Sequence, residues 1–246
     1  MRSLFWCSAI LLVAACGGAK VARDPFAYAA RPLAVHDRVA LSRNGLAVHA
    51  LSFAGANGAR VNAFLIAPRA TGRHAAVLFL HGSGGTRKDL LVPAVELATS
   101  GAVTMTISQP NDAATFRPLV VNARRALDLL TARPDVDANR LGVVGYSLGA
   151  QTAAILAGDE PRLKAVGIVA GRGSRTPLYW IARTHARLYF QAGTLDQVVP
   201  HAQLVALMRA APGNPRISWY PADHGMSLQA FDDQDAWQAR ELGAVR

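Results

Sequence analysis

The stretch RLGVVGYSLGAQTAAIL, from Arg140 to Leu156, constrains the fold more than any other part of the chain. An apolar run enters Gly145-Tyr146-Ser147-Leu148-Gly149, and an alanine-rich helical pattern leaves it. A strand, a sharp turn and a helix in this order hold the serine in a strained backbone conformation, with glycines where side chains would collide. The pattern predicts an exposed serine hydroxyl at the end of a buried strand. The five residues alone would also fit an ordinary serine in a loop.

Buried-strand and helical patterns alternate along the rest of the chain. With 246 residues, of which 51% are hydrophobic, the chain suits one large α/β domain. Alternation of this kind predicts a mostly parallel central sheet with helices on both faces. An antiparallel strand pair at 47–53 and 60–67 is expected at one edge of the sheet, and no insertion is long enough for a cap domain. Further strands are expected at 75–80, 102–107, 165–170, 187–192 and 216–220, and helices at 88–100, 116–133, 178–183, 201–211 and 234–243.

The first 38 residues lack this alternation. A short positive start precedes an apolar segment, Leu4 to Ala15, that is too short to span a bilayer. It ends in Val-Ala-Ala-Cys, which resembles the bacterial lipoprotein signal, in which the cysteine is lipidated; a plain secretory signal cut nearby is the alternative. We therefore expect a signal peptide at 1–15, lipidation at Cys16, a tether and lead-in segment at 16–38 and the folded domain at 39–246.

These signals predict a location in the bacterial cell envelope. The protein would be lipid-anchored there on the periplasmic side, with the membrane as a partner, or otherwise secreted. Both cysteines, Cys7 and Cys16, lie in the N-terminal region, and Cys7 would leave with the signal peptide. The mature domain would then contain no disulfide and would depend on its hydrophobic core.

The charge of the chain is strongly basic. Its net charge is +10, from 26 Lys and Arg against 16 Asp and Glu, and the arginines are scattered along the sequence. A nucleic-acid-binding protein would concentrate them on one face, so we expect no nucleic-acid partner. Two interpretations of the charge remain, a tolerated positive surface or attraction to anionic lipid or an acidic polymer.

A carboxylate and an imidazole follow two of the expected strands. Asp196 comes after the strand at 187–192, and His224 comes after the strand at 216–220. Catalytic groups of open α/β sheets gather at the carboxyl ends of the strands, so both are expected near Ser147. The order Ser147, Asp196, His224 along the chain is that of the α/β-hydrolases rather than that of the serine proteases.

Two other residues compete for these roles. Asp223 stands beside His224, but adjacent residues rarely turn their side chains toward one another, so Asp196 is preferred; Asp196 could instead be a turn-forming aspartate. His81 precedes the glycine-rich loop Gly82-Ser83-Gly84-Gly85. We expect His81 to shape that loop by hydrogen bonding rather than to act as a base.

This constellation predicts nucleophilic catalysis by a serine. A hydroxyl is a weak nucleophile until an imidazole removes its proton, and a carboxylate fixes the tautomer of that imidazole. Ser147 would attack, His224 would be general base and then acid, and Asp196 would orient it. The backbone N–H groups of Leu148 and Ser83 would form the oxyanion hole, in which one donor is typically worth roughly 3–4 kcal/mol of barrier.

No other cofactor chemistry is indicated by the sequence. No histidine–cysteine spacing suggests zinc, and no glycine-rich loop carries the lysine of a nucleotide site. We therefore expect neither a metal nor an organic cofactor.

Taken together, these motifs resemble the α/β-hydrolases of the dienelactone hydrolase and prolyl-oligopeptidase-like branch, over residues 60–243. The resemblance implies an α/β-hydrolase fold without a large cap domain and a carboxylesterase-like serine hydrolase. Two departures stand out. Residues 108–112 read Ser-Gln-Pro-Asn-Asp where such enzymes usually have Asp or Tyr and then Arg-Gly, and dienelactone hydrolases proper use a cysteine in place of Ser147.

The expected function is cleavage of small-molecule or polymeric carboxylic esters through an acyl-enzyme intermediate. A peptidase or acyl-transferase on the same three residues is an alternative, because such a triad serves esters, thioesters and amides alike. A third hypothesis is an envelope binding protein with this fold and no turnover. The presence of all three residues and of both glycine-rich loops argues against that hypothesis.

Overall fold

The computed structural model describes residues 24–110 and 115–244 of the chain. The expected signal peptide, the expected lipidation site Cys16 and the first part of the lead-in segment lie outside the described residues, as do Asn111 and Asp112. Within the described part, no helix is both long enough and apolar enough to cross a membrane.

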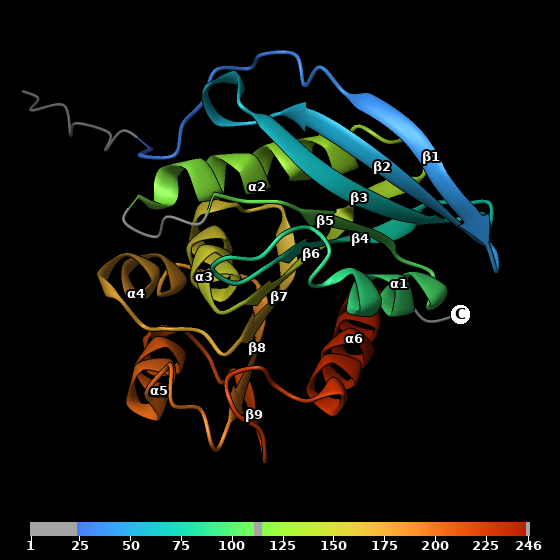
Figure 1. Ribbon diagram of the computed structural model, residues 1–246. Coiled ribbons are helices and arrows are strands. Elements are labelled where there is room, and N and C mark those ends of the chain that lie inside the picture. Colours follow the sequence, from blue (N-terminus) through green and yellow to red (C-terminus); the bar gives the residue numbers. More distant parts are fainter. Residues whose placement is uncertain (1–23, 111–114, 245–246) are drawn as a thin grey trace, which may run out of the picture.

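The centre of the molecule is a nine-stranded sheet in the order β1-β2-β3-β5-β4-β6-β7-β8-β9 (Figure 1). The first three strands run antiparallel to their neighbours, whereas all pairs from β5 to β9 are parallel. The mostly parallel sheet expected from the sequence is therefore confirmed. The strands are β1 (His36–Arg43), β2 (Leu46–Ala54), β3 (Arg60–Pro68), β4 (His74–Leu80), β5 (Val103–Ile107), β6 (Val136–Tyr146), β7 (Leu163–Val169), β8 (Arg187–Gly193) and β9 (Arg216–Tyr220).

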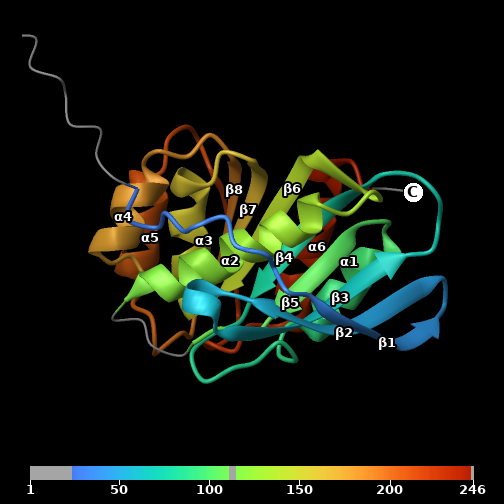
Figure 2. The same ribbon diagram turned by 90° about the horizontal axis from the view of Figure 1, so that it is seen from above.

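Helices cover both faces of the sheet. Apolar residues of α2, α3, α4 and α5 belong to one buried cluster, and those of α1 and α6 belong to another on the opposite face (Figures 1 and 2). The helices are α1 (Leu91–Thr99), α2 (Phe116–Thr131), α3 (Leu148–Asp159), α4 (Arg175–Ile181), α5 (His201–Ala210) and α6 (Leu228–Leu242), with a short 3-10 helix η1 (Ala56–Gly58) between β2 and β3.

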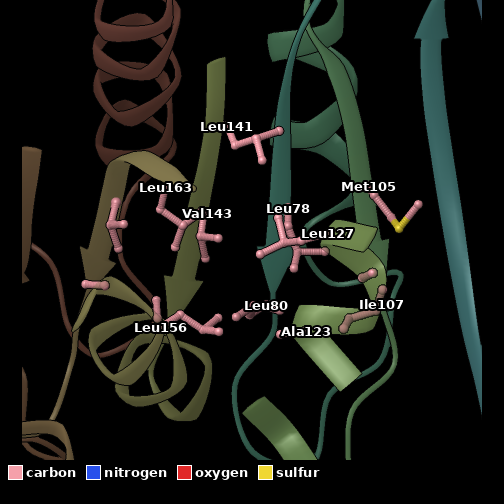
Figure 3. Close-up of a cluster of buried hydrophobic side chains, with 14 of the residues drawn as sticks. Leu78, Leu80, Met105, Ile107, Ala123, Leu127, Leu141, Val143, Leu156 and Leu163 are labelled. Atoms are coloured by element: carbon pink, nitrogen blue, oxygen red, sulfur yellow. The ribbon is translucent and has the colours of Figure 1, made fainter. Parts of the chain in front are cut away.

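Strand β4 shows why the central strands are apolar at every position. Leu78 and Leu80 lie in the cluster that includes Ala123 and Leu127 of α2 (Figure 3), whereas the intervening Phe79 belongs to the cluster on the other face. Successive side chains of a strand point to opposite faces, so a strand covered on both sides must be apolar throughout. These packed strands provide a rigid base for the loops at their carboxyl ends.

The N-terminal part of the domain differs from the expectation. The β2–β3 pair was expected at the edge of the sheet, but β1 pairs with β2 and takes the edge instead. Strand β1 begins at His36, inside the stretch interpreted as tether and lead-in segment, and Phe26 of the same stretch is buried in the core. Because Val39 and Leu41 of β1 are largely exposed, at 59% and 55%, this edge strand lacks the alternation that marks a half-buried strand.

Candidate active site

Ser147 occupies the sharp turn between β6 and α3. Its backbone has φ 54° and ψ −110°, in the left-handed half of the map that residues with a side chain rarely enter. A Cβ on Gly145 would lie 2.2 Å from the carbonyl oxygen of Gly149, and a Cβ on Gly149 would lie 1.9 Å from that of Leu80. Both positions therefore require glycine, as the sequence pattern predicted, and the tight packing holds the serine at the end of β6.

The structure brings the three predicted catalytic residues together. His224 Nε2 lies 2.9 Å from Ser147 Oγ, and His224 Nδ1 lies 2.8 Å from Asp196 Oδ2. The three side chains come from the ends of β6, β8 and β9, which end at the same edge of the sheet. With Nδ1–H donating to the carboxylate, the lone pair of Nε2 faces the serine hydroxyl, which is the geometry that a general base needs.

The second oxygen of Asp196 fixes the carboxylate in place. Its Oδ1 accepts hydrogen bonds from the backbone N–H groups of Val198 and Val199, at 2.8 and 2.9 Å. Burial acts to raise the pKa of this carboxyl group, but the hydrogen bonds from His224, Val199 and Val198 outweigh it and hold the pKa below its ordinary value. Asp196 therefore remains ionised and oriented toward the imidazole.

The competing carboxylate, Asp223, makes a hydrogen bond within the turn that contains it. It is exposed, and its Oδ1 accepts a hydrogen bond from the Gly225 N–H at 2.9 Å. The side chain is thus directed along the loop rather than toward the imidazole ring. Of the two carboxylates, Asp196 is the one that contacts His224.

His81 is buried beneath the glycine-rich loop. Its Nε2 accepts a hydrogen bond from the Gln109 N–H at 2.9 Å, so its Nδ1 carries the proton and donates to the Gly82 carbonyl at 2.6 Å. Both ring nitrogens are engaged in shaping the loops beside the nucleophile. The hydrogen-bonding role expected for His81 agrees with these contacts.

Ser147 and His224 open into a cavity of about 460 Å³. The two residues predicted to supply oxyanion donors, Ser83 and Leu148, line it as well. Leu148 is the first residue of α3, so its N–H has no acceptor within the helix and lies at the positive end of the helix dipole. The other lining residues are Gly82, Tyr146, Gln151, Arg172, Val198 and Val199.

Several cavity residues were missed by the sequence analysis. Gln151 follows Ser147 by one helical turn, since its N–H donates to the Ser147 carbonyl at 3.2 Å, and helical spacing alone could have placed it there. Arg172 follows β7, the neighbour of β6, and its Nη2 donates to the Val198 carbonyl at 3.0 Å. The rule that groups gather at the carboxyl ends of parallel strands could have indicated Arg172.

The described part of the chain, residues 24–110 and 115–244, contains no group of three His, Cys, Asp or Glu side chains that could hold a metal ion. The groups assembled here are those of acyl transfer: a hydroxyl, an imidazole aligned with it, a buried carboxylate behind the imidazole, and backbone donors at the start of a helix.

The sheet order, the strained serine and the edge-clustered histidine and aspartate define an α/β-hydrolase. The family model of the dienelactone hydrolase family matches residues 98–242, more than half of the 246-residue chain. The chain belongs to this family and is a carboxylesterase-like hydrolase.

Solved structures share the fold over most of the chain. An acetyl xylan esterase from Paenibacillus sp. R4 superposes with a TM-score of 0.75 at 16% identity, covering 86% of this chain and 90% of that one. Acetyl xylan esterase 1 from Thermoanaerobacterium sp. JW/SL YS485 gives 0.69 at 17% identity, covering 86% and 88%. A cold-adapted esterase from an Arctic intertidal metagenomic library gives 0.71 at 14% identity, covering 84% and 97%. The comparison with curated proteins gave no match.

Proposed function

We propose that this hydrolase is a serine esterase that cleaves carboxylic esters through an acyl-enzyme intermediate. The observation that carries the proposal is the unbroken hydrogen-bond chain from Asp196 through His224 to Ser147, with separations of 2.8 and 2.9 Å. A serine, an imidazole and an ionised carboxylate aligned in this way are the parts that activate a hydroxyl for attack on a carbonyl.

The proposed reaction has two halves. Ser147 Oγ attacks the ester carbonyl while His224 Nε2 takes the hydroxyl proton, and the N–H groups of Leu148 and Ser83 receive the oxyanion. Collapse of the tetrahedral intermediate breaks the carbonyl–oxygen single bond, and the alcohol leaves with the proton from His224. Water then attacks the acyl-enzyme with His224 as base, which releases the carboxylic acid and restores the serine.

Small acyl esters are the first substrate class to test. Two of the structural neighbours are named as acetyl xylan esterases, which act on a small acyl group. A cavity of about 460 Å³ beside Ser147 accommodates a small or medium acyl group. With no cap domain expected from the sequence, a bulky or polymeric alcohol could also approach the serine.

A fluorophosphonate probe tests the nucleophile directly. We expect one covalent adduct, located on Ser147 by mass spectrometry, and none on the matched Ser147→Ala variant. A panel of 4-nitrophenyl esters, a thioester and a peptide amide then ranks the leaving groups, and we expect esters to be cleaved fastest. An adduct on another serine, or hydrolysis of the peptide but not of the esters, would remove the proposal.

The place of action is a separate part of the proposal. The apolar segment at 4–15 followed by Val-Ala-Ala-Cys supports export and attachment of lipid at Cys16, on the periplasmic side of the bacterial envelope. A lipid anchor would hold the enzyme close to a membrane while its active site handles soluble or polymeric esters.

A further inference from the structure

A second cavity, of about 390 Å³, lies where the lead-in segment crosses the domain, and it shares no lining residue with the active-site cavity. Its walls come from three parts of the chain: four residues of the lead-in segment between 28 and 32, the β2–β3 turn at 54–58, and the part of α2 between residues 117 and 125. Figures 1 and 2 show the described part of the lead-in segment, which begins at residue 24, running over α2 beside η1.

Positive charge dominates this cavity. Arg31, Arg117 and Arg125 line it, and no lining residue is Asp or Glu. Among residues 24–110 and 115–244, none of these three arginines takes part in an ion pair. Asp24 lies close enough to Arg117 to feel its charge, but its carboxylate pairs with Arg124 at 2.8 Å. The three guanidinium groups therefore lack a paired counter-ion in the described part of the chain.

The lack of a paired anion is most unfavourable at Arg125, because this residue is buried. Only 4% of the residue is exposed. Its Nε donates to the Ala54 carbonyl, and its Nη2 donates to the carbonyls of Arg31 and Pro32 at 3.1 and 3.2 Å. A buried cation that meets only neutral carbonyls and an aromatic ring is unfavourable compared with one that also meets an anion.

The remaining walls are mostly apolar. Ala29, Pro32, Pro118 and Val121 contribute aliphatic surface, and the Tyr28 ring lies 5.8 Å from the Arg125 guanidinium carbon. A ligand that suits both features has an anionic head for the arginines and a short apolar group for the walls. The planar guanidinium fork fits the oxygens of a carboxylate or a phosphate.

We propose that this cavity binds an organic anion, a carboxylate or phosphate group carried on a short apolar chain. Such an anion could be a free amphiphile or the head and first carbons of an anionic membrane lipid, since the chemistry recognised is the same. The site is independent of the serine chemistry proposed above, because none of its residues lines the active-site cavity.

Calorimetric titration with octanoate tests the site, using the full chain with Ser147→Ala so that no acyl-enzyme can form. We expect saturable binding to one site that weakens as salt is added, and no binding of neutral octanol. A charge-assisted hydrogen bond is worth about 1.5–3 kcal/mol, so Arg31→Gln or Arg117→Gln should weaken octanoate binding by about tenfold or more. Arg172→Gln is the matched control, because it removes an arginine from the active-site cavity instead.

A blocking variant keeps the test independent of folding. Ala29→Phe fills the cavity from an exposed position and removes no charge or hydrogen bond, so it should abolish octanoate binding while the melting temperature stays close to that of the parent.

Sedimentation with phosphatidylglycerol and phosphatidylcholine vesicles then identifies the source of the anion. Binding to phosphatidylglycerol vesicles that Ala29→Phe abolishes indicates a lipid head, and octanoate binding without vesicle binding indicates a free amphiphile. Failure to bind octanoate, or binding lost in Arg172→Gln but kept in Ala29→Phe, would overturn the proposal.

Discussion

The Tyr146 hydroxyl donates a hydrogen bond of 2.8 Å to the backbone carbonyl of His224, so the residue beside the proposed nucleophile holds the loop that carries the proposed base. The two rings also touch, with centroids 5.5 Å apart, and Phe231 of α6 packs on the tyrosine at 6.4 Å. Burial, with the charges of Asp196 and Asp223 in addition, raises the pKa of Tyr146. The hydroxyl therefore remains protonated and available as a donor at neutral pH.

Tyr146→Phe should lower kcat by about threefold to tenfold, because one hydrogen bond of about 0.5–1.5 kcal/mol no longer fixes the His224 loop. KM should change little, since the ring and the shape of the cavity are kept. Tyr146→Leu, which also removes the ring contact, should lower kcat further. Steady-state kinetics on a neutral ester measure both constants. A rise in KM at constant kcat would assign Tyr146 to substrate binding instead of to positioning.

Asp196→Asn should reduce kcat by about ten-thousandfold, the size of effect seen when a triad carboxylate becomes an amide that stabilises the wrong tautomer of the histidine. Asp223→Asn is the matched control, because Asp223 is exposed and accepts only from its own turn. It should retain activity within a few-fold of the parent. Kinetics of both variants on one ester decide the matter, and the reverse ranking would exchange the two roles.

The sequence was sufficient for the parts of the fold that local patterns encode. Central strands such as β4 are apolar because both faces are covered, and the turn at Ser147 is marked by glycines that tolerate no side chain. Edge strand β1 was not predicted, because its residues are exposed and show neither an apolar run nor an alternation of apolar and polar residues. Helix α6 begins at Leu228, six residues before the expected start, because the Ser227 side chain accepts from the Ala230 N–H and caps it.

The roles that could not be predicted from the sequence depend on contacts between segments that are far apart along the chain. The hydrogen bond of Tyr146 to His224 joins residues 78 positions apart, and Arg125 meets the Arg31 carbonyl across 94 positions. The motif around Tyr146 and the helical pattern around Arg125 give no indication of these partners. Such roles become visible only when the packing of the sheet and helices has fixed which loops are neighbours.

Asp235 of α6 should make stability depend on pH. The residue is only 7% exposed, neither carboxylate oxygen has a hydrogen-bond partner among the described residues, and burial, with Glu96 and Asp232 in addition, raises its pKa from 3.8 to about 8. The folded state thus holds this proton between about pH 4 and pH 8 while the unfolded state releases it. The contribution of Asp235 to the free energy of unfolding is fully present below about pH 4. It falls as pH rises through this window and changes no further above about pH 8.

Asp235→Asn removes this proton linkage while it keeps the shape of the side chain. We expect the variant to melt at a higher temperature than the parent at pH 9 and at a similar temperature at pH 5, because only the ionised form is penalised by burial. Calorimetric melting curves at pH 5, 7 and 9 measure the difference between the two proteins, which cancels the titration of other groups. A variant that is less stable than the parent at pH 9 would contradict the interpretation.

Cys16→Ala should release the protein from the membrane fraction and abolish incorporation of labelled palmitate. A lipoprotein-type cysteine carries at least two acyl chains, and two chains anchor a protein far more firmly than the marginal binding of one. The eight residue-to-residue steps from Cys16 to Asp24 reach at most about 26–29 Å when fully extended, so the anchor would keep the domain next to the bilayer. Cys7→Ala is the matched control and should change neither label nor fractionation, since Cys7 would leave with the signal peptide. Fractionation and fluorography of both variants in the same bacterial host provide the test. Retention of label by Cys16→Ala would show that lipid is attached elsewhere, and a parent protein without label would show that the signal is of the plain secretory kind.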